Sequence, residues 1–226
     1  MIIFDWLNQV DTQLFLALNG WNNSYFDRFF TLFTSMQVWF PLYILLVIQL
    51  VRKYKIQAIW LLLFFILTIV ASDQLSGLFK VIVQRLRPTH APALLGLVNA
   101  PAGKGGLYGF VSSHAANSFA LTFLLGFLAN RKRIWSAFIL WSLLTVYSRI
   151  YVGVHYPLDI FCGALLGFLI AWGIYRLLLL FDHNFQQNRI LKGDKWELKY
   201  TNPLLIALIF ITITLFIVSF LMVKYF

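Results

Sequence analysis

Three short stretches of the sequence place ionisable side chains at the edges of long apolar runs. The densest is residues 148–159, which hold a Ser, an Arg, a His and an Asp between two apolar segments. An ionisable group in hydrocarbon costs a few kcal/mol, so such groups are rare there unless they have a function. Residues 80–88 and 112–114 bring further Lys, Arg, Ser and His side chains. We therefore expect the three stretches to contribute to one site.

The side chains of this combined set suit the binding of a phosphoryl group. Three cations, two histidines and one carboxylate make up the set: Lys80, Arg87, Arg149, His114, His155 and Asp159. An Arg side chain presents a planar fork of donors that matches phosphate oxygens, and a Lys side chain adds a point charge. Ser112 and Ser113 come just before an apolar run, where a helix N-terminus would add free N–H groups and the positive end of its dipole.

His155 and Asp159 are spaced for catalysis by a histidine. They are four residues apart, and the intervening Pro157 is typical of the first turn of a helix. The carboxylate can then reach the imidazole and fix its tautomer. A neutral His155 could attack phosphorus through Nε2, while His114 protonates the leaving oxygen. General acid catalysis of this kind contributes about 10² to 10⁴ in rate.

The apolar runs predict the elements that position these residues. Of the 226 residues, 61% are hydrophobic and only 12% are charged, whereas about a quarter are charged in a soluble domain. Six runs suit the roughly 20 residues that cross a bilayer core of about 30 Å, the first and third being short. They are approximately 38–51, 56–79, 114–129, 134–151, 158–181 and 203–223. The sequence therefore predicts an all-α integral membrane protein with six transmembrane helices.

Basic clusters predict the orientation of these helices. Residues 52–55, 131–133 and 189–199 fall on one side, which the positive-inside rule makes cytoplasmic. Because these clusters supply much of the net charge of +10, we do not expect nucleic acid as a partner. Both termini, the 80–113 loop and the 152–157 turn then share the opposite face. The cations of that loop lie on the non-cytoplasmic face, where the positive-inside rule predicts few basic residues. Binding of an anionic ligand explains their presence there.

The first 35 residues differ in composition from the apolar runs that follow them. Polar and aromatic residues alternate there, which predicts interfacial amphipathic helices, although a short helix pair packed on the bundle fits equally well. The segment lacks the basic start of a cleavable signal peptide. Elsewhere, Gly163 and Gly167 form a Gly-x-x-x-Gly pattern that predicts close packing of two helices within the molecule. Cys162 is the only cysteine, so no intramolecular disulfide is expected.

The motifs resemble those of the type 2 phosphatidic acid phosphatase superfamily, integral-membrane lipid phosphatases related to vanadium haloperoxidases. The first motif of that family, Lys, six residues, Arg-Pro, is matched by Lys80 through Arg87-Pro88. The third, Ser-Arg, five residues, His, three residues, Asp, is matched by Ser148-Arg149, His155 and Asp159. The second, Pro-Ser-Gly-His, stands here as Val111-Ser112-Ser113-His114, with two positions changed.

The resemblance implies a role for each matched residue. Lys80, Arg87 and Arg149 would hold the phosphate, assisted by Ser112 and the amide of Ser113. His114 would be the acid, and His155 the nucleophile oriented by Asp159. Such enzymes form a phosphohistidine that water hydrolyses, without a metal or cofactor. The side chain of Ser113 in place of Gly would crowd the phosphate if the backbone needs φ > 0, or would donate one more hydrogen bond. We expect activity to survive.

The expected protein is one membrane domain over residues 1–226, with an interfacial segment at 1–35, a six-helix bundle at about 36–226 and an extracytoplasmic active-site loop at 80–113. It would remove phosphate from a lipid phosphate or pyrophosphate at the outer, periplasmic face of a bacterial inner membrane. Undecaprenyl pyrophosphate, phosphatidylglycerol phosphate and lipid A phosphates are the candidate substrates, and surrounding lipids the other partners.

Three other functions compete with hydrolysis. A phosphotransferase would pass the group from His155 to another acceptor, a lipid carrier would use the cations only for binding, and a scaffold would have lost catalysis through the change at Ser113. Arg85, inside the first motif but not one of its defining positions, would equally bind lipid headgroups. The motifs do not specify the lipid or the oligomeric state.

Overall fold

The computed structural model describes residues 2–185 and 195–225, and within these ranges the protein is helical without β-strands. The helices are α1 (Ile2–Asn19), α2 (Ser24–Phe33), α3 (Phe40–Tyr54), α4 (Ala58–Val83), α5 (Ser113–Ala129), α6 (Lys132–Tyr151), α7 (Pro157–Phe185) and α8 (Leu198–Tyr225). Short 3-10 turns lie at Met36–Trp39, Lys55–Gln57, Pro88–His90 and Pro92–Leu94. The prediction of an all-α membrane protein is confirmed.

Four helical stretches of the described chain are long and apolar enough to cross a membrane. They are Met36–Val83, Lys132–Tyr151, Pro157–His183 and Leu198–Lys224. The first stretch contains both α3 and α4, which are separated by the Lys55–Gln57 turn and pack against each other. The apolar helix α5 is shorter, at 17 residues. The chain is therefore a multi-pass membrane protein.

Several helix boundaries differ from those that the sequence predicts, and two of them follow from local backbone chemistry. Helix α4 continues to Val83 and ends at Gln84, which adopts a left-handed backbone with φ 50°. Lys80 thus lies in the last helical turn, and the long loop begins four residues later than expected. Helix α8 begins at Leu198, upstream of Pro203, which lies inside the helix and leaves one backbone carbonyl without its N–H partner. Arg189 and Lys192 of the third basic cluster lie outside the described residues.

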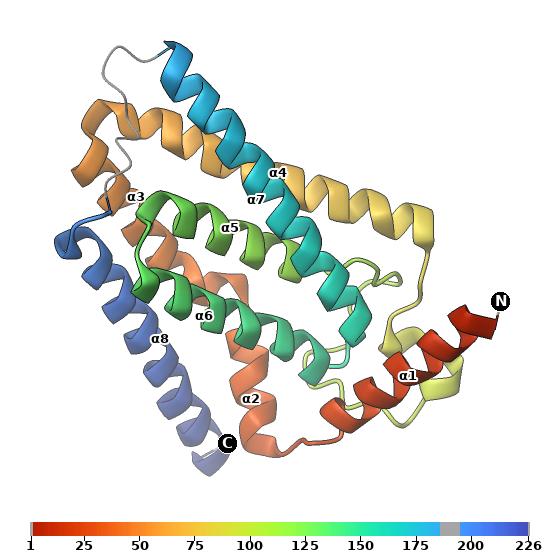
Figure 1. Cartoon of the computed structure of the whole chain (residues 1–226). Helices are drawn as coiled ribbons and strands as arrows, with labels where there is room; N and C mark the ends of the chain where they lie inside the picture. The colour runs from red at the N-terminus through yellow and green to blue at the C-terminus, as the bar shows by residue number, and fades with distance from the viewer. Residues whose placement is uncertain (1, 186–194, 226) are drawn as a thin grey trace.

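Helix α5 is the centre of the bundle, where α4, α6 and α7 all contact it (Figure 1). Most of its side chains are buried, so this short helix has little surface to offer to lipid. Its closest neighbour is α7, because Gly163 and Gly167 let the two backbones approach. A Cβ at Gly163 would lie 2.6 Å from the carbonyl oxygen of Ser112, and one at Gly167 would collide with the carbonyl of Ala116. The predicted close packing at the Gly-x-x-x-Gly pattern is confirmed.

Helix α1 lies across the ends of α6 and α7 (Figure 1). Three of its residues at helical spacing face the bundle and are buried: Asp11, Phe15 and Asn19. The opposite face exposes Trp6, Val10 and Leu14. The Asn19 amide donates hydrogen bonds to the carbonyl oxygens of Ile150 (3.1 Å) and Tyr151 (2.7 Å), which end α6. The first helix is therefore both amphipathic and bonded to the bundle.

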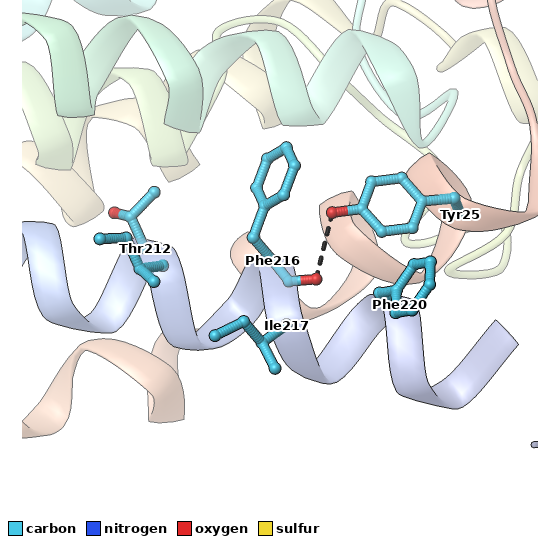
Figure 2. A pocket seen from close by; sticks show the side chains of 6 residues that line it. Tyr25, Thr212, Phe216, Ile217 and Phe220 are labelled. Carbon is cyan, nitrogen blue, oxygen red and sulfur yellow. Dashed lines mark hydrogen bonds between the residues drawn. The ribbon is translucent and has the colours of Figure 1, made fainter. Parts of the chain in front are cut away.

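Helix α2 packs against α8 and α6. Asn23 caps its N-terminus by accepting a hydrogen bond from the N–H of Phe26 at 2.9 Å. Between α2 and α8 lies an open apolar groove of about 610 Å³, lined by Tyr25, Thr212, Ile213, Phe216, Ile217 and Phe220. Figure 2 shows the Tyr25 hydroxyl reaching the backbone carbonyl of Phe216, to which it donates at 3.1 Å. Since none of the six residues is charged, this groove is not the phosphate site.

Candidate active site

The predicted site residues converge at one end of the bundle. Lys80 lies in the last turn of α4, His114 in the first turn of α5 and Arg149 in the last turn of α6. His155 lies in the turn between α6 and α7, and Asp159 in the first turn of α7. Helices that follow one another in opposite directions bring these ends together, so residues up to 79 positions apart in sequence share one site.

Asp159 is the most completely held residue of the site. It is fully buried. Its Oδ2 accepts the backbone N–H of Tyr156 at 3.0 Å, and its Oδ1 accepts Nη1 of Arg85 at 2.8 Å. The backbone carbonyl of Asp159 accepts the N–H of Ser112 at 3.0 Å, which ties α7 to the start of α5. The carboxylate therefore has a fixed position.

The predicted pair of His155 and Asp159 is present. Nδ1 of His155 lies 3.5 Å from Oδ2 of Asp159, slightly beyond the 2.7–3.2 Å of a hydrogen bond. Such contacts tighten in many enzymes when substrate binds. His155 is 1% exposed, and burial lowers its pKa to about 4; Asp159 works against this shift, while Arg149 and Arg87 add to it. The imidazole is therefore neutral at neutral pH, as a nucleophile must be.

Ser113 lies against Lys80, the first predicted phosphate ligand. The Lys80 ammonium donates a short hydrogen bond to the Ser113 hydroxyl, which also lies 2.7 Å from the Ser76 hydroxyl. Ser113 begins α5 with helical backbone, not with the positive φ that glycine favours. Its side chain therefore causes no backbone strain. Ser76 of α4 is the third member of this polar chain between α4 and α5.

Ser112 is the N-cap of α5. It is fully buried, and its hydroxyl accepts the N–H of Ala115 at 3.4 Å. A serine at this position satisfies one of the free N–H groups that every helix start leaves. His114 follows in the first turn with an exposed side chain, in the electrostatic field of Arg149, His155, Arg87 and Lys80. The positive end of the α5 dipole thus points into the cluster.

Arg149 enters the site with its charge uncompensated. One terminal nitrogen, Nη1, donates to the hydroxyl of Thr34 at 2.6 Å, and the buried Nε has no hydrogen-bond partner. None of the carboxylates in the described part of the chain forms an ion pair with this guanidinium. A largely covered arginine without an acidic partner is costly unless an anion binds it. Arg149 is thus available to a phosphate group.

The loop after α4 folds back over Arg87 and over the pair of His155 and Asp159. Nε of Arg87 donates to the carbonyl of Tyr108 at 3.1 Å. Burial lowers the pKa of Arg87, and the Asp159 carboxylate offsets part of this effect. Gly109 passes so close that a Cβ there would lie 3.0 Å from Oδ2 of Asp159, 3.2 Å from Cγ of Arg87 and 3.5 Å from Nδ1 of His155. The loop is therefore part of the site.

Arg85, for which headgroup binding was one expectation, lies between two acids in the structure. Its guanidinium contacts Asp159 and also Asp11 of α1, with Nη2 2.6 Å from Oδ2 of Asp11. Burial disfavours its charge, but Asp159 and Asp11 outweigh that effect and raise the pKa of Arg85. The guanidinium also lies over the ring of Tyr156, 4.1 Å from its centroid.

Sequence reasoning missed the contributions of Asp11, Thr34 and Gly109 to this site. A signal existed for Asp11, since it shares the 11, 15, 19 face of an amphipathic helix whose other face is apolar. A lone threonine and one glycine among many in the long loop carry no comparable pattern. Their importance follows from contacts between segments that are distant in sequence.

Fold and site together define the class of the protein: a multi-pass membrane protein with a cationic, histidine-containing site at one end of its helix bundle. The comparison with known families is more specific. Residues 58–182 match the model of the PAP2 superfamily, which covers more than half of the chain, and the chain belongs to that superfamily. This is the type 2 phosphatidic acid phosphatase superfamily that the motifs resemble, so the sequence-based assignment is confirmed.

Three known proteins illustrate the similarity. The chain is 32% identical over 209 residues to a lipid A 4'-phosphatase of Bacteroides thetaiotaomicron, covering 90% of this chain and 92% of that protein. The crystal structure of Aquifex aeolicus LpxE is similar with a TM-score of 0.59 and 31% identity, over 73% of this chain and 94% of that one. A transmembrane PAP2-type phosphatidylglycerolphosphate phosphatase from Bacillus subtilis shares the fold, with a TM-score of 0.63, 19% identity and coverages of 81% and 89%.

Proposed function

We propose that the protein is a membrane lipid phosphatase that removes a phosphate group through a phosphohistidine intermediate on His155. The enzyme class rests on the superfamily and on relatives that are named as lipid phosphatases. The observation that carries the mechanism is that Lys80, Arg87 and Arg149, none of which forms an ion pair within the described residues, lie near a neutral, buried His155. Such an arrangement attracts an anion and presents a nucleophile to it.

Each residue has a step in the proposed reaction. Nε2 of His155 attacks phosphorus, since Nδ1 faces Asp159, and the bond from phosphorus to the lipid oxygen breaks. The negative charge of the bound phosphate offsets the surrounding cations and lets His114 take up a proton, which it gives to that oxygen as the neutral lipid alcohol leaves. A water molecule, deprotonated by His114, then attacks the phosphohistidine, so that inorganic phosphate leaves and His155 is neutral again. Asp159 stabilises the imidazolium character that develops on His155 in both steps.

The cations and the α5 N-terminus stabilise the charge of the transferring group. Arg87 and Arg149 supply forked donors, Lys80 a point charge, and Ser112 with the amide of Ser113 the donors of the helix start. These groups neutralise the phosphoryl oxygens without a metal. His155 is nearly covered in this structure, whereas His114 is exposed, so the lipid phosphate reaches Nε2 from the His114 side.

For membrane topology we propose six crossings, with both termini and the site on the periplasmic face of a bacterial inner membrane and residues 1–226 acting as one domain. The basic residues at the opposite helix ends, Arg52, Lys53 and 131–133, support this orientation through the positive-inside rule. The short α5 crosses within protein, where its 17 residues face other helices more than lipid. A lipid with its phosphate at the outer surface then meets the site directly.

For the substrate we propose a phosphate of lipid A, because the similarity to a named lipid A 4'-phosphatase covers 90% of the chain. Purified protein in detergent with excess chelator is assayed for phosphate release from lipid A, undecaprenyl pyrophosphate and phosphatidylglycerol phosphate. We expect lipid A to be the preferred substrate. Another preference would correct the substrate but leave the mechanism.

Substitution of His155 tests the mechanism. We expect His155→Ala to lose phosphate release by at least about 10⁴-fold, because the nucleophile is removed. The matched control is His183→Ala, which lies roughly 39 Å along α7 from its first residue, at a rise of about 1.5 Å per residue. An active His155→Ala enzyme, or an absolute metal requirement in the wild type, would refute the mechanism. A carrier would keep its function in His155→Ala and lose it in Arg149→Ala.

A further inference from the structure

A chain of ion pairs leads from α1 to the carboxylate beside the proposed nucleophile. Asp11 Oδ2 lies 2.6 Å from Nη2 of Arg85, and Nη1 of the same guanidinium lies 2.8 Å from Oδ1 of Asp159. The second oxygen of Asp159 is the one that faces Nδ1 of His155. Asp11 and Asp159 are both buried, so the pairs are little screened by water.

Asp11 holds Asp159 in a second way, through the backbone. Its Oδ1 accepts the N–H of Leu158 at 2.9 Å, at the start of α7 and one residue before Asp159. One carboxylate of α1 therefore fixes both the guanidinium that binds the Asp159 side chain and the peptide that precedes it. The ring of Tyr156 beneath Arg85 further restricts that guanidinium.

The charges along this chain of ion pairs determine the electrostatic potential at the His155 imidazole. Arg85 alone would cancel the negative charge of Asp159 and deprive the imidazole of its favourable partner. Asp11 compensates Arg85, so the group of three has one net negative charge. Among the described residues, the other charged groups that act on His155, or on His114 beside it, are the cations Arg149, Arg87 and Lys80. Asp11 thus restores the negative charge that an imidazolium at position 155 requires.

We infer that Asp11 and Arg85 are positioning residues of the phosphatase, which act through Asp159 to orient His155 and support its charge. This inference rests on the proposed function. It also assigns a task to α1, a helix that lies outside the 58–182 region matched by the family model. Neither residue touches the substrate, so both act on kcat more than on KM.

The test is a double-mutant cycle with Asp11→Asn and Asp159→Asn, with kcat and KM measured for phosphate release from lipid A in detergent. Asp11→Asn should lower kcat by about 10- to 30-fold with KM within about threefold, because the Asp159 carboxylate loses its support. In the Asp159→Asn background the same change should alter kcat by less than about threefold, because residues that act through one partner are not additive. Asp5→Asn is the control, since this exposed acid of α1 has the same charge change.

The pH profile separates this role from a structural one. With Asp11 neutralised, the acid limb of kcat/KM should move to lower pH, since His155 is then surrounded by more positive charge. Arg85→Lys should also lower kcat about tenfold, non-additively with Asp159→Asn, because one ammonium does not bridge two carboxylates as a guanidinium does. Arg85→Lys keeps the positive charge, so it tests the positioning role even if Asp11→Asn unfolds.

The outcomes are distinguishable. A wild-type protein that releases phosphate from no lipid phosphate refutes the proposed function, and the inference with it. An active wild type whose Asp11→Asn or Arg85→Lys losses multiply with that of Asp159→Asn, with an unmoved acid limb, refutes the inference alone. Equal losses in Asp5→Asn and Asp11→Asn would also refute it, since a general effect of charge on α1 would then explain both.

Discussion

Substitution of Gly109 by alanine tests whether the long loop is built around the His155 and Asp159 pair. The added Cβ would lie 3.0 Å from Oδ2 of Asp159, whereas ordinary contacts begin at 3.4 Å, so this oxygen must retreat by about 0.4 Å. The backbone of Gly109 does not have the positive φ that alanine avoids, which leaves steric crowding as the cause. A misplacement of about 1 Å in an active site costs about 10²-fold. We therefore expect kcat to fall about tenfold, or about 1.4 kcal/mol in the barrier.

The assay is phosphate release from the lipid substrate in detergent, together with thermal unfolding of each variant. Gly106→Ala is the matched control, because it lies in the same loop, has no positive φ and has nothing within 4 Å of the added Cβ. It should keep wild-type kcat. Wild-type kcat in Gly109→Ala, or an equal loss in Gly106→Ala, would show that the loop is not fitted to the pair of His155 and Asp159.

Three further predictions concern the nucleophile, the changed motif position and the helix packing. Because burial holds the pKa of His155 at about 4, kcat/KM should fall about tenfold per pH unit below pH 4. The substrate's own ionisation near pH 6 adds a separate limb to the pH profile. A histidine limb at 6.5, with none below pH 4, would contradict the burial. Ser113→Gly should keep kcat within a few-fold, since it removes a hydroxyl that contacts Lys80 and Ser76 but keeps the backbone amide, and a hundredfold loss would mean that the hydroxyl binds phosphate. Gly167→Ala should destabilise the fold by about 1–3 kcal/mol in denaturation, because its Cβ meets the α5 backbone, whereas Gly173→Ala, with open space around it, should not.

Much of the helix bundle could be predicted from the sequence because hydrocarbon imposes simple rules. Long apolar runs must be helices in a membrane, and their ends are marked by charge, so α6 and α7 lie within a few residues of their predicted bounds. Boundaries failed where local backbone chemistry decided them. The left-handed cap at Gln84 extends α4, and Pro203 lies inside α8 instead of starting it.

The candidate site was predictable to the extent that its residues lie in compact motifs. The convergence of Lys80, Arg87, Arg149, His114 and His155 follows from the alternation of helix directions alone. The partners that hold these groups were not predictable in the same way. Asp11 and Thr34 come from segments that the motifs do not include, and their contacts depend on how α1 and α2 pack against the bundle. Such long-range contacts have no periodic signature in a sequence.

The position of α1 across the bundle ends has a consequence for how the protein is made. Helix α1 is synthesised before α6 and α7, but the backbone groups of Ile150 and Leu158 that Asn19 and Asp11 bind are 131 and 147 residues further along the chain. At roughly 5–20 residues per second, translation reaches those groups about 7–30 s later. Until then the two polar side chains must remain with water or headgroups at the membrane surface. The catalytic constellation is therefore among the last features of the molecule to form, and a nascent chain that stops before α7 has no active site.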